Sequence, residues 1–386
     1  MGGSAPWLPS SFDEEEDMRS VRVGSAVVVC LAVILGGALR LRLADTAKTD
    51  WDEDDYMIPA AMFRRLIDAG DLSGIPDVQQ TAEHPPLGKL LFALTIDGDE
   101  LPDFPDKNVR YMQRIYLPPA SLERARLQSV LAGTLTVLAT ALVSPPGGLV
   151  LAVQSIHVHY SSVAYLDALA TLLTALGVFL YNSKTDRRWA LWASAACLGA
   201  AAAVKYPYGV AAGAVALHAI ATRRFGWRDL ARWGIIAGAV FFALNPYLWP
   251  DPVDRLRAQL RYHHDYTKRP IVQHDILTPL EYMLGPSHLS HLLDDPADYE
   301  LLLVTDRLWF VAAAVGLILL ARRRSAYAWW AAIGFAFLMI WPTQWVQHTM
   351  LVVVPYSICA GTGLAAAGRG LQQGRLRIRA MAAKAA

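Results

Sequence analysis

Ten apolar stretches divide this chain, and most of them approach the length that a helix needs to cross a lipid bilayer, about 20 residues. Backbone groups inside a bilayer must bond to one another, which favours helices over irregular structure. The pattern predicts an all-α polytopic membrane protein. The stretches cover residues 22–40, 125–143, 147–163, 165–181, 189–204, 206–221, 233–249, 304–321, 326–342 and 345–366.

The composition agrees with a membrane location. Of 386 residues, 54% are hydrophobic and only 18% are charged, whereas a soluble domain typically carries about 25% charged residues. The chain is too apolar for a disordered protein. Its three cysteines lie far apart in apolar stretches, so we expect neither a disulfide framework nor a cysteine metal site. No nucleic-acid-binding signature is present.

The charges sort by side of the membrane. If the N-terminus is cytoplasmic, four inner segments together contain fifteen basic and two acidic residues, as the excess of Lys and Arg in cytoplasmic loops requires. The outer loop 42–124 holds sixteen acidic and nine basic residues. Arg40 and Arg42, just beyond the first span, run against this rule. We expect both termini in the cytoplasm, with loops 42–124 and 250–303 outside.

The first span could be mistaken for a signal peptide. The segment before it is acidic, and its apolar run is longer than a usual signal core, so we interpret it as an uncleaved anchor. The expected organisation is a cytoplasmic segment 1–21, one transmembrane domain 22–366 and a basic cytoplasmic tail 367–386. Within loop 42–124, residues 55–68 and 86–96 predict two short helices lying at the membrane interface.

Unusual polar residues gather on the outer side of this topology. Ionisable groups within spans or at their ends are costly and usually functional. Several of them converge on one face, as a site that receives its substrate from the lipid would require. The residues are Asp52, Glu53, Glu83, His84, Asp167, Lys205, His263, His264, Lys268, Gln347 and His348.

Each of these signals also has a simpler interpretation. The acidic residues 52–55 could favour the positive N-terminal end of the helix 55–68, an interpretation that suits Asp54 and Asp55 better than the more distant Asp52. Asp167 could be a helix N-cap. Lys205 could extend to the membrane interface, although it lies on the side that disfavours lysine. Most loop histidines could be plain surface residues, and His157, His159 and His218 are expected to be structural.

Two motifs carry a family resemblance. Trp51-Asp52-Glu53-x-x-Tyr56, followed by Glu83-His84-Pro85-Pro86-Leu87-Gly88-Lys89, resembles the GT-C fold glycosyltransferases, in the group of the protein O-mannosyltransferases and the lipid A aminoarabinose transferases. The latter carry Lys-Pro-Pro where this chain has His84-Pro85-Pro86. Weaker matches are Arg126-Leu127-x-Ser129, Leu166-Asp167, Val204-Lys205 and Asn245-Pro246-x-x-Trp249-Pro250.

The resemblance implies transfer of a mannose-like hexose or related sugar from a polyprenyl- or dolichyl-phosphate donor to an acceptor hydroxyl or amine, with inversion, at the extracytoplasmic face. Asp52 is then the candidate general base, and Glu53 orients Asp52 or the acceptor. The anionic leaving group needs cations, for which the candidates are His84, Arg126 and Lys205. Tyr56, Glu83, Asp167, His263 and His264 are supporting or acceptor-binding candidates.

Cofactor and acceptor stay open at this stage. The resemblance allows a divalent metal shared by Glu83 with His263 or His264, but two ligands are too few to establish one. The acceptor is a protein, a lipid or a glycan, and the missing luminal insertion favours the plasma membrane of a prokaryote. The alternatives are a transporter, which would need paired halves with matching short or interrupted spans near the bilayer midplane, and a non-catalytic partner subunit.

Overall fold

A computed structural model describes residues 11–50, 52–78, 80–97, 118–183, 188–266, 268, 275–284, 297–341 and 345–385 of the chain. These residues form helices and connecting loops, with no strand among them. The α-helices are α1 (Ser11–Thr46), α2 (Glu53–Asp68), α3 (Leu87–Ala93), α4 (Pro119–Val143), α5 (Pro145–Val153), α6 (Ser155–Tyr160), α7 (Asp167–Asn182), α8 (Arg188–Val204), α9 (Gly209–Thr222), α10 (Trp227–Ala243), α11 (Pro252–Tyr266), α12 (Thr278–Met283), α13 (Ala297–Arg322), α14 (Ala326–Ile340) and α15 (Met350–Ala385). Short 3-10 helices are η1 (Leu72–Asp77), η3 (Tyr206–Tyr208), η4 (Pro246–Leu248) and η7 (Val346–Thr349).

The predicted all-helical membrane fold is confirmed. Three described helices are long and apolar enough to cross a membrane: Val23–Thr46, Pro119–Val143 and Val346–Lys384. Shorter apolar helices coincide with three more predicted spans: Asp167–Asn182, Arg188–Val204 and Ala326–Ile340. Both short helices predicted in the first outer loop are present as α2 and α3.

One predicted span is wrong in its continuity. Residues 147–163 form two helices, α5 and α6, separated at Gln154, whose backbone is extended. The Gln154 side chain caps α6 by accepting a hydrogen bond from the His157 backbone N–H at 2.8 Å. An apolar run shows length but not whether a polar side chain within it has replaced a backbone hydrogen bond, so the break was not visible in the sequence.

Arg40 of α1 stabilises this break. Its side chain is completely buried, and its guanidinium donates to the carbonyl oxygens of Leu151 and Ala152 at the end of α5, at 3.3 and 3.2 Å. It also contacts the His157 ring and the Ser161 hydroxyl. The last carbonyls of a helix lack partners within that helix, so Arg40 supplies them. Its unexpected position beside the outer loop therefore has a structural cause.

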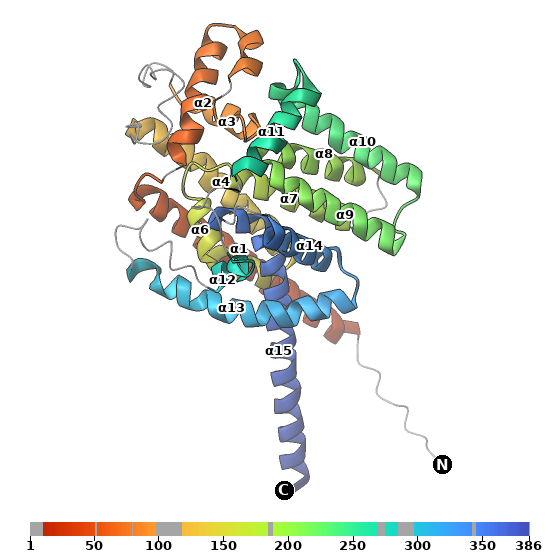
Figure 1. Cartoon of the computed structure of the whole chain (residues 1–386). Helices are drawn as coiled ribbons and strands as arrows, with labels where there is room; N and C mark the ends of the chain where they lie inside the picture. The colour runs from red at the N-terminus through yellow and green to blue at the C-terminus, as the bar shows by residue number, and fades with distance from the viewer. Residues whose placement is uncertain are drawn as a thin grey trace.

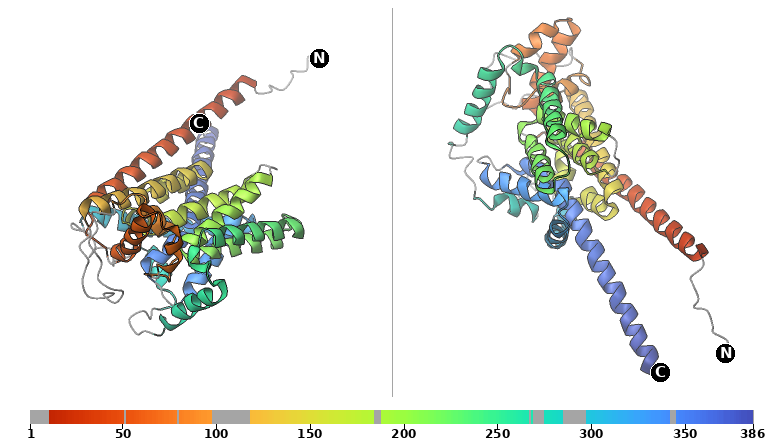
Figure 2. Two further views of the ribbon diagram at one scale, coloured as in Figure 1. Left: turned by 90° about the horizontal axis from the view of Figure 1, so that it is seen from above. Right: turned by 90° about the vertical axis from the view of Figure 1, so that its right-hand side faces the viewer.

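The described structure keeps the two predicted faces apart. The start of α1 and the end of α15 lie toward the lower side of Figure 1, and α2, α3 and α11 lie on the upper side, an arrangement that the second view in Figure 2 repeats. Two of the loops that the charge rule placed together touch each other, and a third touches α9. Arg224 donates to the Ser183 carbonyl at 3.3 Å, and His218 lies 2.9 Å from the Arg324 carbonyl.

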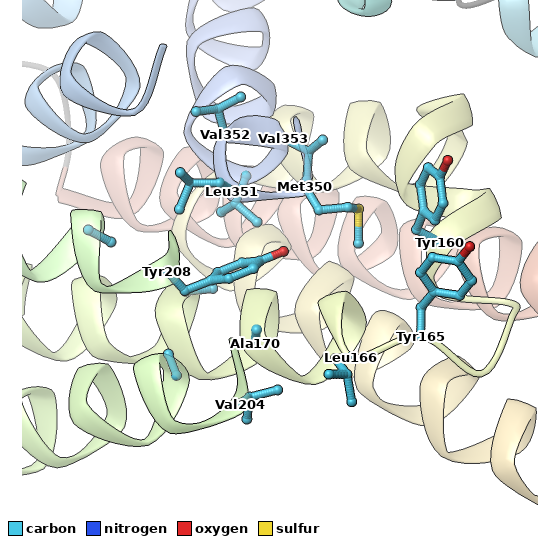
Figure 3. Close-up of a cluster of buried hydrophobic side chains, with 14 of the residues drawn as sticks. Tyr160, Tyr165, Leu166, Ala170, Val204, Tyr208, Met350, Leu351, Val352 and Val353 are labelled. Atoms are coloured by element: carbon cyan, nitrogen blue, oxygen red, sulfur yellow. The ribbon is translucent and has the colours of Figure 1, made fainter. Parts of the chain in front are cut away.

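The final helix passes through the core and then continues beyond it. Its first residues, Met350 to Val354, are almost completely buried, and Figure 3 shows Met350 and Leu351 beside Tyr208. From Gly368 onward α15 is exposed and extends alone from the bundle (Figures 1 and 2). Buried helix and exposed helix therefore meet close to the predicted start of the basic tail.

Small residues let α13 and α15 approach closely. A β-carbon at Gly316 would lie 1.7 Å from the Cys359 carbonyl oxygen, and one at Gly363 would lie 2.1 Å from the Ala312 carbonyl oxygen. Close backbone contact through small residues is a common way for helices to associate in membranes. The contact holds the start of α15 against the rest of the core.

We predict that Gly316→Ala lowers the free energy of unfolding by about 1–3 kcal/mol, because the added methyl group forces α13 and α15 apart. Gly370→Ala, where a β-carbon meets nothing within 4 Å, should be neutral or stabilise by up to about 1 kcal/mol through helix propensity. Thermal unfolding of both variants in the same detergent measures the difference. Equal stabilities would show that the helices do not pack this closely.

Candidate functional site

A buried ion pair lies beside the candidate site. The Glu53 carboxylate, which is completely buried, accepts bonds from Arg126 Nε at 2.8 Å and Nη2 at 2.7 Å. It also accepts from the backbone N–H groups of Ala164 and Asp50, at 2.7 and 2.9 Å. Glu53 therefore links α2 to α4 through Arg126, to the segment before α2 through Asp50, and to the segment before α7 through Ala164.

Arg126 uses all five of its N–H groups in this arrangement. Besides its two bonds to Glu53, it donates to the carbonyl oxygens of Ala44, Ala47 and Lys48, at 2.9 to 3.0 Å. These carbonyls belong to the end of α1 and the residues after it, which need partners from outside the helix. In this arrangement every N–H of Arg126 is bonded within the protein, so none is available to bind a phosphate. The planar guanidinium instead stabilises the fold.

Asp52 lies one residue before this ion pair, at the N-cap of α2, and its side chain makes no capping bond. Gln347 Nε2 donates to its Oδ2 at 3.2 Å. Burial raises the pKa of the Asp52 carboxyl to about 7, helped by nearby Asp55 and opposed by nearby Lys205. A carboxyl group with this pKa changes its protonation close to neutral pH.

Lys205 lies in a buried cluster with Asp167 and Tyr208. Its Nζ donates to Asp167 Oδ2 at 2.7 Å, and the Tyr208 hydroxyl donates to Asp167 Oδ1 at 3.0 Å. Lys205 is 1% exposed, so the interpretation that it extends to the membrane interface is wrong. Asp167 is the first residue of α7 after the N-cap Leu166, so the N-cap interpretation is also wrong. Only one of the three Lys205 N–H groups bonds to a described residue.

The loop before α3 brings His84 to the same place. Lys89, which is completely buried, holds this loop by donating to the carbonyl oxygens of Thr81 and His84, at 2.9 and 2.8 Å. The His84 ring meets the edge of Tyr56 with centroids 5.6 Å apart. Burial, Lys205 and Lys89 hold the pKa of His84 well below its usual value. His84 is therefore a neutral hydrogen-bonding group at pH 7.

Helix α11 meets Glu83 through its aromatic face. The Tyr262 hydroxyl donates to Glu83 Oε1 at 3.3 Å, whereas His263 Nε2 lies 3.3 Å from the Glu83 backbone carbonyl. His264 is exposed. Among the described residues, no three His, Cys, Asp or Glu side chains lie close enough together to hold a metal ion. The donor set for the suggested metal is thus incomplete, and no chemical step is assigned to one.

The structure brings most of the predicted site residues together, but Lys268 and His264 lie on the surface. Electrostatic interactions link Asp52 with Lys205 and Asp167, and link Tyr56 with Asp52 and Glu83. Glu53 and Arg126 instead bond to each other. Lys268 bonds to Asp265 on the surface, and His274, His288 and His291 lie outside the described residues. As expected, Asp54 and Asp55 occupy the first turn of α2.

Sequence reasoning missed two members of this region. Asp50 is buried, and its Oδ2 lies 3.2 Å from His159 Nε2. Tyr208 completes the Lys205–Asp167 cluster. Asp50 was hidden within an acidic run, and the position of Tyr208, three residues after Lys205 across η3, was its only signal.

We predict that Arg126→Met lowers the free energy of unfolding by about 3–5 kcal/mol, because it leaves the Glu53 carboxylate buried without its cation. Adding Glu53→Gln to that variant should recover part of the loss, because the uncompensated charge is removed. Arg124→Met, two residues earlier on α4, removes bonds to the Thr95 carbonyl and the Ser121 hydroxyl and should cost about 1 kcal/mol. Chemical unfolding in detergent tests this; similar losses for Arg126→Met and Arg124→Met would contradict it.

The sequence matches no protein-family model, and no curated protein is similar enough to match it. Its structure is similar to ArnT from Cupriavidus metallidurans bound to undecaprenyl phosphate, with a TM-score of 0.58 and 15% identity over 88% of this chain and 60% of that one. The apo state of the same protein gives a TM-score of 0.58 and 16% identity over 90% and 60%. The chain thus spans about 60% of the length of the ArnT chain.

The structure is less similar to the S. cerevisiae protein O-mannosyltransferase Pmt1–Pmt2 complex bound to the sugar donor. The match has a TM-score of 0.40 and 17% identity over 58% of this chain and 33% of that one, which is too distant to support a conclusion. The likeness to ArnT extends over most of the helices described above. The chain therefore has the GT-C fold of membrane glycosyltransferases.

Proposed function

We propose that the protein is a membrane glycosyltransferase that transfers a sugar from a polyprenyl- or dolichyl-phosphate donor to an acceptor hydroxyl or amine. The observation that carries the proposal is that Asp52, whose pKa burial raises to about 7, lies within electrostatic reach of Lys205, a buried cation that keeps N–H groups available. A base and a phosphate-binding cation within electrostatic reach of each other are what this transfer requires.

Asp52 acts as the general base in this proposal. Its Oδ2 accepts a bond from Gln347, and its Oδ1 has no partner among the described residues. The acceptor oxygen or nitrogen forms a bond to the anomeric carbon while its proton passes to Asp52. The bond from that carbon to the phosphate oxygen breaks, and its electron pair leaves with the lipid phosphate. One displacement inverts the anomeric centre.

Lys205 binds the leaving phosphate. Asp167 and Tyr208 hold its ammonium group in place, and the N–H groups that they do not use can meet phosphate oxygens. His84, which is neutral, contributes a hydrogen bond and no charge. A fixed cation in a site with little water stabilises the charge that develops on the leaving group. The undecaprenyl phosphate bound to the similar ArnT structure supports a lipid phosphate as the leaving group.

We assign Glu53 and Arg126 to positioning, because their bonds to each other and to the backbone hold Asp52 in place. Tyr56, Glu83, His263 and His264 lie on or beside the elements that border the site, and they are proposed to contact the acceptor. The acceptor is a protein, a lipid or a glycan. The site faces the extracytoplasmic side of a prokaryotic plasma membrane, with both termini in the cytoplasm.

We predict that Asp52→Asn reduces donor turnover at least about 100-fold, the lower end of what a positioned base contributes. The variant should fold, because the ionised carboxylate is the form that burial disfavours; at pH 8 the amide should equal or exceed the wild type in thermal stability. Mass spectrometry of donor consumption, with a panel of polyprenyl-phosphate sugars and purified protein in lipid, measures turnover. Asp54→Asn, in the first turn of α2, is the matched control and should retain activity.

We predict that kcat/KM for the acceptor rises with pH and levels off above about pH 7. The base acts when deprotonated, and a pKa of about 7 leaves about a tenth of Asp52 ionised at pH 6. The rate should therefore fall about tenfold from pH 8 to pH 6. A profile that is flat between pH 5 and pH 8, measured with chemistry as the slow step, would remove Asp52 from the base role.

A further inference from the structure

A continuous row of aromatic rings runs along one side of the site. Successive ring centroids are 4.7 Å apart from His159 to Tyr160, 5.3 Å to Tyr165, 5.6 Å to Tyr56 and 5.6 Å to His84. Figure 3 shows Tyr160 and Tyr165 side by side, with their hydroxyl groups pointing to the same side. Three different segments contribute these rings, so the row is a tertiary feature and not a pattern along one helix.

The row connects the charged groups of the site. At one end, His159 Nε2 lies 3.2 Å from Asp50 Oδ2, and at the other end Lys205 acts electrostatically on His84. Asp52 acts electrostatically on Tyr56, Tyr160 and Tyr165 between those ends. A molecule in contact with the middle of the row would therefore lie within electrostatic reach of the proposed base, and the His84 end of the row lies within reach of the proposed phosphate-binding cation.

The tyrosine hydroxyls have no structural use in the described part of the chain. Tyr160 and Tyr165 are 4% and 3% exposed, and neither hydroxyl has a hydrogen-bond partner among the described residues. A tyrosine hydroxyl on a nearly buried ring usually has a partner, and neither of these two oxygens is among the fully enclosed polar atoms, so both are open to a ligand. At the two ends, the enclosed Nδ1 atoms of His84 and His159 also have no partner.

We propose that Tyr160 and Tyr165 bind the glycosyl group of the lipid-linked donor through its hydroxyl groups. A hexose presents C–H faces that suit aromatic rings and a rim of hydroxyls that suit phenol groups and ring nitrogens. The row holds the anomeric carbon near Asp52 while Lys205 holds the phosphate. The inference rests on the proposed function and adds to it a sugar-binding wall that selects hydroxyl-rich hexoses.

The test compares binding of two ligands to the full-length protein in lipid nanodiscs: undecaprenyl phosphate, and undecaprenyl phosphate carrying glucose, mannose or galactose. Tyr160→Phe and Tyr165→Phe should each weaken binding of the preferred lipid-linked hexose about fivefold, the effect of one neutral hydrogen bond. Binding of undecaprenyl phosphate should not change. Lys205→Met should weaken binding of both ligands, and Tyr327→Phe, a buried tyrosine on α14 at the opposite end of the bundle, should weaken neither.

A sharper test removes the hydroxyl from the sugar. The Tyr165→Phe penalty should disappear for the deoxy-hexose that lacks the hydroxyl bound by Tyr165, because each change removes the same bond. The inference would be overturned if the tyrosine variants weakened binding of undecaprenyl phosphate and of the lipid-linked hexose equally, or if they did not weaken binding of the lipid-linked hexose at all. Neither result would contradict the proposed transfer reaction. Wild-type protein that binds undecaprenyl phosphate but consumes no lipid-linked sugar would instead overturn the proposed function.

Discussion

Two charges buried together, Glu53 and Arg126, determine where the other polar groups of this protein can lie. Neither can be removed from water alone without a large cost in free energy, so α1, α2, α4 and the loop before α7 must meet where the pair forms. Every hydrogen-bonding position of both groups is occupied. Asp52 immediately precedes Glu53 in the chain, so the rigid, fully bonded pair holds the proposed base at a defined place.

The electrostatics around Asp52 depend on a single cation. Asp50, Asp55 and Asp167 all act to keep Asp52 protonated, and Lys205 opposes them. Burial, together with Lys205 and Lys89, keeps His84 uncharged by lowering its pKa. The site therefore assigns different roles to different groups: a carboxyl that titrates near neutrality, a fixed ammonium group for the phosphate, and an uncharged imidazole that does not compete for the proton.

The sequence predicted the helical membrane fold because long apolar runs have few other structures open to them. It also predicted that Asp52, Asp167, Lys205 and His84 would converge, because charges are rare in membrane proteins and each one is informative. It did not show that Arg126 bonds to Glu53, since seventy-three positions separate them and only the tertiary structure brings them together. Tyr160 and Tyr165 were hidden for a different reason: aromatic residues in an apolar run look like core.

Arg40 has a consequence for how the protein assembles. Its partners Leu151, Ala152, His157 and Ser161 follow it by 111 to 121 positions. During synthesis the first helix therefore enters the bilayer before any of these four partners has been made. The end of α1 and the interrupted span can reach their final state only together. Final packing of the first helix is thus coupled to formation of the break in the third span, despite the distance between them in the chain.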